Sequence, residues 1–227
     1  QTKKIMNKFA IKNYLISFNK HNSFKKIPFI IDSLKKGNSI ALVSDAGLPG
    51  ICDPGEDLVK EAKLNDIQII CIPGPCAALT ALVTSGISSS KFIFEGFLPK
   101  KKKDRNQILL EISNYEKTTI IYESPYRINQ LLRELKHYCG GDRLIQVSRE
   151  LTKKFEENIC NNVDNIISIL DGKEILGEIT VIIKGIDKSN DKDIDVKYLR
   201  EELYELIKAG LSLSAASKYL AKKTKIS

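Results

Sequence analysis

Apolar runs alternate with amphipathic stretches along most of the chain. The runs are rich in isoleucine and valine and lack helical spacing, which favours buried strands. Strands that are apolar without interruption are typical of a parallel sheet covered on both faces. The alternation therefore predicts an α/β fold. We expect strands at 14–18, 39–44, 67–72, 92–95, 118–123, 144–148 and 179–183.

Stretches with helical periodicity fall between these strands and continue after the last one. Two acidic residues open the helix expected at 56–63, and a proline opens the one expected at 125–138. Both features favour a helix N-terminus. A further helix should follow the turn at 73–76. The remaining helices are expected at 2–10, 24–34, 106–115, 196–208 and 212–221.

The 227 residues are enough for a sizeable core and more than one structural unit. A serine run at 88–90 divides the strand-containing part, and the polar segment 187–195 is a candidate linker. We expect an N-terminal α/β subdomain at 1–89, a second α/β subdomain at 90–186, and a helical C-terminal region at 195–227.

Positive charge is concentrated in patches rather than spread over the chain. Residues 1–40 hold nine lysines and one aspartate, which equals the net charge of +8 of the whole chain. Residues 208–227 add five lysines and no acid. A third group is the lysine cluster (Lys100, Lys101, Lys102 and Lys103) with Arg105. Such patches suggest a polyanionic partner such as nucleic acid, although an AT-rich genome would also enrich lysine.

The cysteine and histidine content argues against several kinds of site. Five cysteines without a C-x-x-C pair favour free thiols over a disulfide framework or a structural zinc site. Only two histidines are present, so we expect no metal. No apolar run approaches the roughly 20 residues of a membrane span, and the N-terminus lacks the features of a secretory signal. These features predict a cytoplasmic protein without membrane contact.

Two turns rich in proline and glycine follow neighbouring predicted strands. The first, VSDAGLPGICDPG (43–55), is neither a P-loop nor a dinucleotide fingerprint. Open α/β sheets nevertheless bind ligands where strands end, and glycine lets a ligand approach the bare backbone. We expect residues 44–51 to face a ligand and 52–55 to turn the chain into its helix; the alternative is that Asp45 and Asp53 only cap turns. PGPCA (73–77) repeats the arrangement one strand later.

Five segments resemble one family in order and spacing: VSDAGLPGICDPG, IPGPCAALTALVTSGISSSKFIFEGFLPKKKKDR, TTIIYESPYRI, VSRELTKKFEE and GEITVIIKG. The chain resembles the ribosomal RNA small subunit methyltransferase I family of the tetrapyrrole methylase superfamily. The resemblance implies two α/β subdomains with a cofactor cleft between them and a small helical C-terminal appendage. It further implies S-adenosyl-L-methionine as cofactor, a homodimer, and methylation of a cytidine 2′-hydroxyl in the decoding region of 16S rRNA.

The resemblance also implies roles for individual residues. Glu123 is the candidate catalytic base. The alternative for Glu123, Arg127, Arg149 and Glu150 is an internal salt-bridge network, and the alternative for the lysine cluster is a solvated loop. Candidate RNA contacts are the lysine cluster, Arg105, Arg127, Arg149 and Lys153. Candidate cofactor contacts are Ser44, Asp45, Ala46, Gly47, Leu48, Gly50, Ile51, Pro75, Cys76, Ala77, Tyr122, Gly177, Glu178 and Ile179.

The chain departs from the family pattern in several places. Leu48 stands where threonine is usual, Cys52 and Cys76 where serine is usual, and Tyr126 where histidine is usual. We also expect the family's first strand, first helix and second strand to be missing, and the C-terminal region to be cut short. Two other functions therefore stay open: a catalytically impaired RNA-binding remnant, and a methyltransferase with a small tetrapyrrole-type acceptor. The resemblance places the protein in a bacterial cytoplasm or a plastid stroma.

Overall fold

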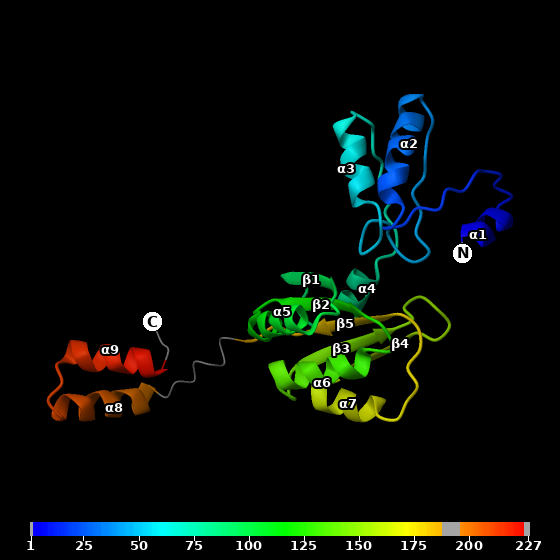
Figure 1. Cartoon of the computed structure of the whole chain (residues 1–227). Coiled ribbons are helices and arrows are strands. Elements are labelled where there is room, and N and C mark those ends of the chain that lie inside the picture. Colours follow the sequence, from blue (N-terminus) through cyan, green and yellow to red (C-terminus); the bar gives the residue numbers. More distant parts are fainter. Residues whose placement is uncertain (1, 188–195, 225–227) are drawn as a thin grey trace. The chain divides into compact units, whose positions relative to one another are not determined.

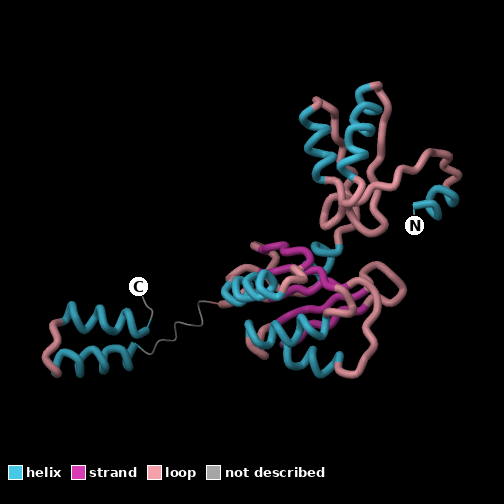
Figure 2. The backbone as a smooth tube through the Cα atoms, viewed as in Figure 1, coloured by secondary structure: helices cyan, strands magenta, loops and turns pink. Residues whose placement is uncertain are grey.

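The computed structural model describes residues 2–187 and 196–224 (Figures 1 and 2). It divides into two compact units, Gln1–Gly185 and Ile186–Ser227, and each is described by itself. Residues 188–195 of the predicted linker lie outside the described residues. The mixed fold of helices and a β-sheet confirms the predicted α/β class.

A five-stranded sheet forms the centre of the first unit, with the order β1-β2-β5-β3-β4 (Figure 2). Its strands are β1 (Phe92–Phe97), β2 (Thr118–Glu123), β3 (Leu144–Arg149), β4 (Glu157–Asn162) and β5 (Ile179–Ile183). β1 and β2 are parallel, and β5 is antiparallel to both β2 and β3. β1, β2 and β3 therefore run in the same direction and end at one edge, which we call the carboxyl edge. β5 and β4 begin at that edge, since β4 is antiparallel to β3.

Helices cover both faces of this sheet (Figure 1). On one face, α5 (Lys102–Asn114), α6 (Ile128–Cys139) and α7 (Val163–Leu170) bury the larger apolar cluster against Ile121 and Val181. On the other face, α4 (Ala77–Thr84) packs against Ile120 and Ile182. Neighbouring strand residues point to opposite faces. Apolar residues at successive positions therefore supply both cores.

Three further helices precede the sheet: α1 (Thr2–Lys8), α2 (Ser23–Lys35) and α3 (Glu56–Leu64). α2 and α3 lie side by side and bury a small apolar cluster. Ile30 and Ile31 from α2 meet Leu58 and Ala62 from α3 in that cluster. Apolar residues recur with helical spacing in both sequences, which explains why each helix presents one apolar face to the other.

The strands predicted at 14–18, 39–44 and 67–72 are wrong for this structure. These segments have no strand assignment, and none of them belongs to the described sheet. Several of their apolar side chains are exposed, with Ile70 at 71% and Ile72 at 76%, while Phe18 and Ile67 pack against the cluster of α2 and α3. A strand exists only where its backbone pairs with a neighbour. The apolar pattern specifies side chains that favour a strand but does not supply the partner.

Most other predicted elements are confirmed, with shifted boundaries. α5 begins at Lys102, four residues earlier than predicted, so part of the lysine cluster is helical. α6 begins at Ile128, so Pro125 precedes this helix instead of lying in its first turn. Sequence reasoning missed β4 and α7. The sequence of β4, ENICNN, is too polar to stand out as a strand.

The second unit contains α8 (Val196–Lys208) and α9 (Leu213–Thr224), both at predicted positions. The two helices contact each other, and Ala216 and Leu220 of α9 are buried. Gly210 has a φ of 97° in the turn between them, a conformation that glycine adopts at little cost. Within the described residues, no helix is both long and apolar enough to cross a membrane.

Leu135 provides a test of the larger core. It lies on α6 and is 0% exposed, so Leu135→Ala should lower the free energy of unfolding by about 2–5 kcal/mol through lost burial and a residual cavity. Leu110→Ala on α5 is the control, because Leu110 is 56% exposed. Urea denaturation followed by circular dichroism measures both. Equal losses in the two variants would contradict the described packing of α6.

Candidate ligand site at the carboxyl edge of the sheet

The carboxyl edge gathers candidate site residues from four separate segments of the sequence. The lysine cluster follows β1, and Glu123 to Arg127 follow or end β2. Arg149 ends β3, with Lys153 in the loop beyond it. Gly177 and Glu178 immediately precede β5. The direction of the strands therefore brings these residues to one edge, although they are spread over about 80 residues of sequence.

The loop 43–55 is held in shape by a side chain near each of its ends. The Ser44 hydroxyl lies 2.5 Å from Asp53 Oδ2 and 3.0 Å from the Ala46 carbonyl oxygen. Asp53 therefore closes the loop and does not cap α3, whose N-cap is Gly55 without a side-chain hydrogen bond. Residues 44–51 are exposed or half-buried, so their backbone groups are accessible.

This loop meets the loop 73–76 through bare backbone. A Cβ atom at Gly47 would lie 3.4 Å from the Pro75 carbonyl oxygen, and Gly47 has a φ of 74°. A Cβ atom would fit at that distance, but a side chain would strain the backbone at this φ. The two Pro/Gly-rich turns that sequence analysis singled out are therefore neighbours, and the backbone conformation of Gly47 favours glycine.

The same loop also touches the end of β1. A Cβ atom at Gly96 would lie 2.7 Å from Cys52 Sγ, and Cys52 forms a hydrogen bond with the Phe97 backbone. Partial burial raises the pKa of the Cys52 thiol. The thiol is therefore a neutral packing group that connects the loop to the sheet. Sequence reasoning missed Gly96 and Phe97, although both lie in the FEGF stretch that carried the resemblance.

Tyr122 connects the sheet to the N-terminus of α4. Its phenol oxygen accepts a hydrogen bond of 3.1 Å from the Ala78 backbone N–H, one of the N–H groups that a helix start leaves unpaired. The ring packs edge-on against Phe94 at 5.1 Å. Burial raises the pKa of Tyr122 to about 12. Cys76, the N-cap residue of α4, lies beside it in the same apolar cluster.

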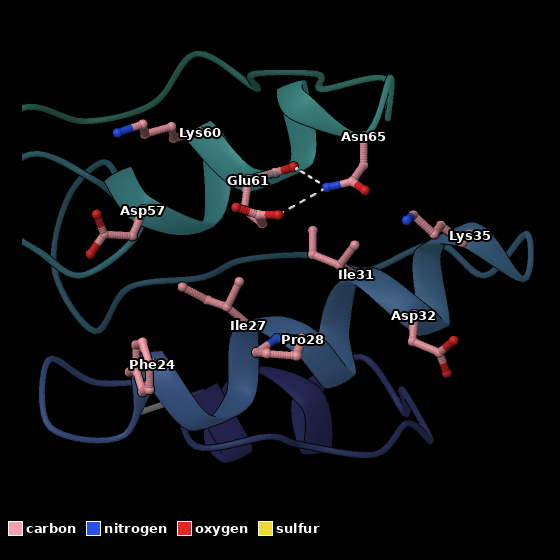
Figure 3. Close-up of a pocket in the computed structure, with 10 residues that line it drawn as sticks. All are labelled: Phe24, Ile27, Pro28, Ile31, Asp32, Lys35, Asp57, Lys60, Glu61 and Asn65. Atoms are coloured by element: carbon pink, nitrogen blue, oxygen red, sulfur yellow. Dashed lines mark hydrogen bonds between the residues drawn. The ribbon is translucent and has the colours of Figure 1, made fainter.

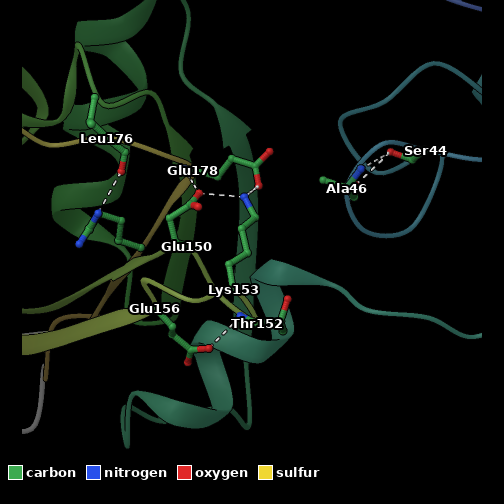
Figure 4. Close-up of polar contacts among 9 residues, drawn as sticks. Ser44, Ala46, Glu150, Thr152, Lys153, Glu156, Leu176 and Glu178 are labelled. Atoms are coloured by element: carbon green, nitrogen blue, oxygen red, sulfur yellow. Dashed lines mark hydrogen bonds and ion pairs between the residues drawn. The ribbon is translucent and has the colours of Figure 1, made fainter. Parts of the chain in front are cut away.

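Ion pairs fix the loop after β3 against the start of β5 (Figure 4). Lys153 Nζ lies 2.8 Å from Glu150 Oε1 and 2.9 Å from Glu178 Oε2. The Glu178 N–H donates to Glu150 Oε1, and the Glu150 N–H donates to the Glu178 carbonyl oxygen. The Lys153 ammonium and the Glu178 N–H both lower the pKa of Glu150. A Cβ atom at Gly177 would overlap the Glu150 carboxylate, so this packing requires glycine.

Glu123 lies in a buried ion-pair network, the arrangement that the sequence left as an alternative to a catalytic base. Its side chain is 0% exposed. Its carboxylate lies 3.1 Å from Arg105 Nη2 and 2.7 Å from Arg127 Nη2, and it accepts a hydrogen bond from the Ser124 N–H. Arg105 Nε also pairs with Glu134 at 2.7 Å. The network joins β2, α5 and α6.

Two candidate assignments need correction from the geometry. Arg105 is only 3% exposed and its guanidinium lies in the buried network, so it is not available to contact RNA beside the lysine cluster. The Ile179 side chain is 3% exposed and belongs to the larger apolar core. Its side chain is therefore a packing group of the core. The helical period explains the first error, because Arg105 lies on the face of α5 that packs inward.

The other basic candidates keep more exposure. All four members of the lysine cluster are exposed. Arg149 is partly engaged, because its guanidinium lies 3.1 Å from Glu157 Oε2 and 3.4 Å from the Leu176 carbonyl oxygen. The Arg127 side chain is 24% exposed above its pair with Glu123. The lysines are therefore the main accessible positive charge at the carboxyl edge.

A separate pocket of about 590 Å³ lies between α2 and α3 (Figure 3). Its floor includes Ile27, Pro28 and Ile31, and acidic and basic side chains mix around it. None of the candidate site residues lines it. The mixed charge gives the pocket no clear selectivity for an anion or a cation, so we place the candidate site at the carboxyl edge instead.

The residues at that edge fit the cofactor that the resemblance implies. S-adenosyl-L-methionine offers an adenine, ribose hydroxyls and an amino-acid group, all of which can hydrogen-bond to backbone N–H and C=O groups. The loops 43–55 and 73–76 provide such groups around the close approach of Gly47 and Pro75. Cys76 and Leu48 depart from the family pattern in their side chains only, so the backbone groups at these positions stay available.

Comparison with known proteins defines the class. Residues 15–166 match the family of Tetrapyrrole (Corrin/Porphyrin) Methylases. The fold is similar to diphthine synthase, with a TM-score of 0.60 and 13% identity over 81% of this chain and 74% of that one. It is also similar to the methyltransferase CobJ, with a TM-score of 0.55 and 17% identity over 71% of this chain and 70% of that one. The fold is that of the tetrapyrrole methylases.

Curated relatives narrow the class. A protein of Synechocystis is 37% identical over 99% of this chain and 81% of its own length. One of Buchnera aphidicola is 43% identical over 85% of this chain and 69% of its own, and one of Haemophilus influenzae is 37% identical over 96% and 77%. All three are named ribosomal RNA small subunit methyltransferase I. The chain belongs to the ribosomal RNA small subunit methyltransferase I family.

The two kinds of basic residue after β1 should respond differently to truncation. Arg105→Ala leaves the buried Glu123 carboxylate with less compensation, so it should lower the free energy of unfolding by about 3 kcal/mol or more. Lys102→Ala is the control and should change stability by less than about 0.5 kcal/mol, because Lys102 is exposed. Chemical denaturation compares them. Similar stability of the two variants would refute the buried position of Arg105.

Tyr122 should make stability depend on pH in the alkaline range. The unfolded chain releases this proton near the ordinary tyrosine pKa of about 10, whereas the folded chain holds it to about 12. The stabilisation is therefore complete below pH 10 and is lost as the pH rises toward 12. Denaturation midpoints between these pH values should fall less steeply for Tyr122→Phe than for the wild type. Identical slopes would show that Tyr122 is not buried as described.

Proposed function

We propose that the protein is an S-adenosyl-L-methionine-dependent rRNA methyltransferase that modifies the 2′-hydroxyl of a cytidine in the decoding region of 16S rRNA. Family membership supports an rRNA methyltransferase. One observation carries the proposal. The loops 43–55 and 73–76, whose backbone groups are accessible, lie against each other at the sheet edge where the exposed lysine cluster also lies. That edge combines a place for a nucleoside cofactor with a place for a polyanion.

Different segments of the chain would bind the cofactor and the RNA. When bound, the cofactor would supply a sulfonium methyl group: the 2′-oxygen would attack the methyl carbon in line as the carbon–sulfur bond breaks, with loss of the hydroxyl proton and the thioether as leaving group. The loops 43–55 and 73–76 hold the cofactor through backbone contacts, and Tyr122 fixes the start of α4 beside them. The lysine cluster holds RNA phosphates. Positioning of this kind supplies a large part of the rate enhancement in group transfer.

Glu123 has a positioning role in this proposal. Two guanidinium groups and a backbone N–H surround its carboxylate, and the side chain is 0% exposed. A base must reach the proton that it removes. We therefore propose that Glu123 fixes the conformation of the turn that follows β2, and we assign no residue as the base.

We further propose a homodimer located in a bacterial cytoplasm or a plastid stroma, as the family resemblance implies. Light scattering coupled to size exclusion measures the mass in solution. A mass near twice the 25.5 kDa of one chain would support the dimer, and a monomer at micromolar concentration would refute it.

Cofactor binding can be tested with two glycine variants. Gly47→Ala should weaken S-adenosyl-L-methionine binding at least tenfold, because alanine is strained at a φ of 74° and would shift the backbone of the loop that holds the cofactor. Gly140→Ala is the matched control, since Gly140 has a similar φ of 86° but open space around it at the end of α6. Both variants bear similar backbone strain. Isothermal titration calorimetry compares their affinities after each is shown to be folded.

The reaction itself is tested on small ribosomal subunits that lack the modification. Incubation with S-adenosyl-L-methionine should produce one 2′-O-methylcytidine in the decoding region, mapped by mass spectrometry of nuclease fragments. Cofactor binding without RNA methylation would favour a small-molecule acceptor. RNA binding without cofactor binding would favour a catalytically impaired RNA-binding protein.

A further inference from the structure

Tyr126 is the most exposed large side chain at the carboxyl edge, at 91%. It occupies the turn between β2 and α6, next to Arg127. Among the described residues, its ring has no hydrogen-bond or aromatic partner. A tyrosine side chain that is almost fully exposed adds little to the stability of the fold. We therefore looked for a binding role for Tyr126.

Hydrogen bonds and an ion pair fix the turn that carries Tyr126. The Glu123 carboxylate accepts from the Ser124 N–H at 2.8 Å and pairs with Arg127 Nη2 at 2.7 Å. The Arg127 N–H donates to the Ser124 carbonyl oxygen at 3.0 Å, and the Ile128 N–H donates to it at 3.1 Å. α6 then begins at Ile128, whose side chain is 0% exposed. The ring therefore projects from a backbone with little freedom, so a ligand would meet it with a small entropic cost.

Basic residues lie at the same edge of the sheet as this ring. β1 and β2 are neighbouring parallel strands, so the lysine cluster after β1 and the turn after β2 leave the sheet side by side. Arg105, two residues beyond the lysine cluster, and Arg127, next to Tyr126, pair with the same Glu123 carboxylate, which keeps the two segments together. Arg127, which directly follows Tyr126 in the sequence, adds a partly exposed guanidinium group.

We propose that Tyr126 is a stacking platform for an unpaired RNA base, and that the lysine cluster binds the phosphates of the same strand. This inference rests on the proposed function for the identity of the polyanion as RNA. An aromatic face flanked by cations is the general chemistry of single-strand binding. A base inside a duplex has both faces covered by its neighbours, so the platform selects nucleotides in loops, bulges or opened helices.

A fluorescence experiment tests stacking directly, because the chain contains no tryptophan. Tyr126→Trp creates a single reporter at the proposed platform. Its emission should be quenched by a single-stranded oligoribonucleotide and much less by a duplex of the same length. Tyr204→Trp is the matched control: Tyr204 is also exposed, at 62%, but lies on α8. Equal quenching at both positions, or none at Tyr126→Trp while anisotropy shows bound RNA, would overturn the proposal.

Affinity measurements separate stacking from charge. Tyr126→Ala should weaken single-strand binding about five- to tenfold, and Tyr126→Phe should retain it. Lys102→Ala should weaken single strands and duplexes alike and reduce the salt dependence of binding, because it removes a phosphate contact. Fluorescence anisotropy at several salt concentrations measures all of these. Wild-type affinity of Tyr126→Ala for single strands would refute the platform.

These assays contain no methyl donor, so they fail independently of the proposed function. Methylation of ribosomal subunits with no effect of Tyr126→Ala on single-strand affinity would overturn the platform alone. Failure of the wild type both to bind RNA and to methylate it would overturn the platform together with the proposed function. Loss of single-strand affinity in Tyr126→Ala, with retention in Tyr126→Phe, would support the stacking platform.

Discussion

The buried carboxylate of Glu123 is the constraint on which the carboxyl edge depends. A charge with no exposure is tolerated only when it is paired and hydrogen-bonded. Its partners come from two places: Arg105 on α5 and Arg127 in the turn before α6. Arg105 also pairs with Glu134 of α6. One strand end therefore fixes the positions of two helices and the turn between β2 and α6, and removal of either arginine leaves a buried charge less compensated.

The same network explains how the basic residues after β1 are divided. The helical period directs Arg105 into the network and leaves Lys102 and Lys103 exposed in the first turn of α5. Cations are unfavourable at that position, because the N-terminus of a helix carries partial positive charge. Asp104 is the single acidic residue that offsets them there. Local rules of this kind are broken most often at functional sites, and an anionic partner would remove the conflict.

The sequence predicted the helices of the first half correctly, but its predicted strands are confirmed only from Phe92 onward, for a physical reason. The strands from Phe92 onward have neighbours with which to pair, so an apolar run there becomes β-structure. The run at 39–44 has the same composition but no partner in the described sheet. Composition also could not reveal β4, because its side chains are polar. It is a strand because its backbone pairs with β3. For the site, motif spacing identified the two loops, whereas the inward position of Arg105 required knowledge of where α5 begins.

Contacts at two glycines connect the loop 43–55 to its neighbours. Gly47 lies against the Pro75 carbonyl oxygen of the second loop, and Gly96 of β1 lies against Cys52 Sγ with no room for a Cβ atom. Cys52 contributes this contact and a hydrogen bond with the Phe97 backbone. A serine at this position would be smaller and more polar than the thiol. Glycine at these two positions therefore lets the loop 43–55 lie against both the second loop and β1.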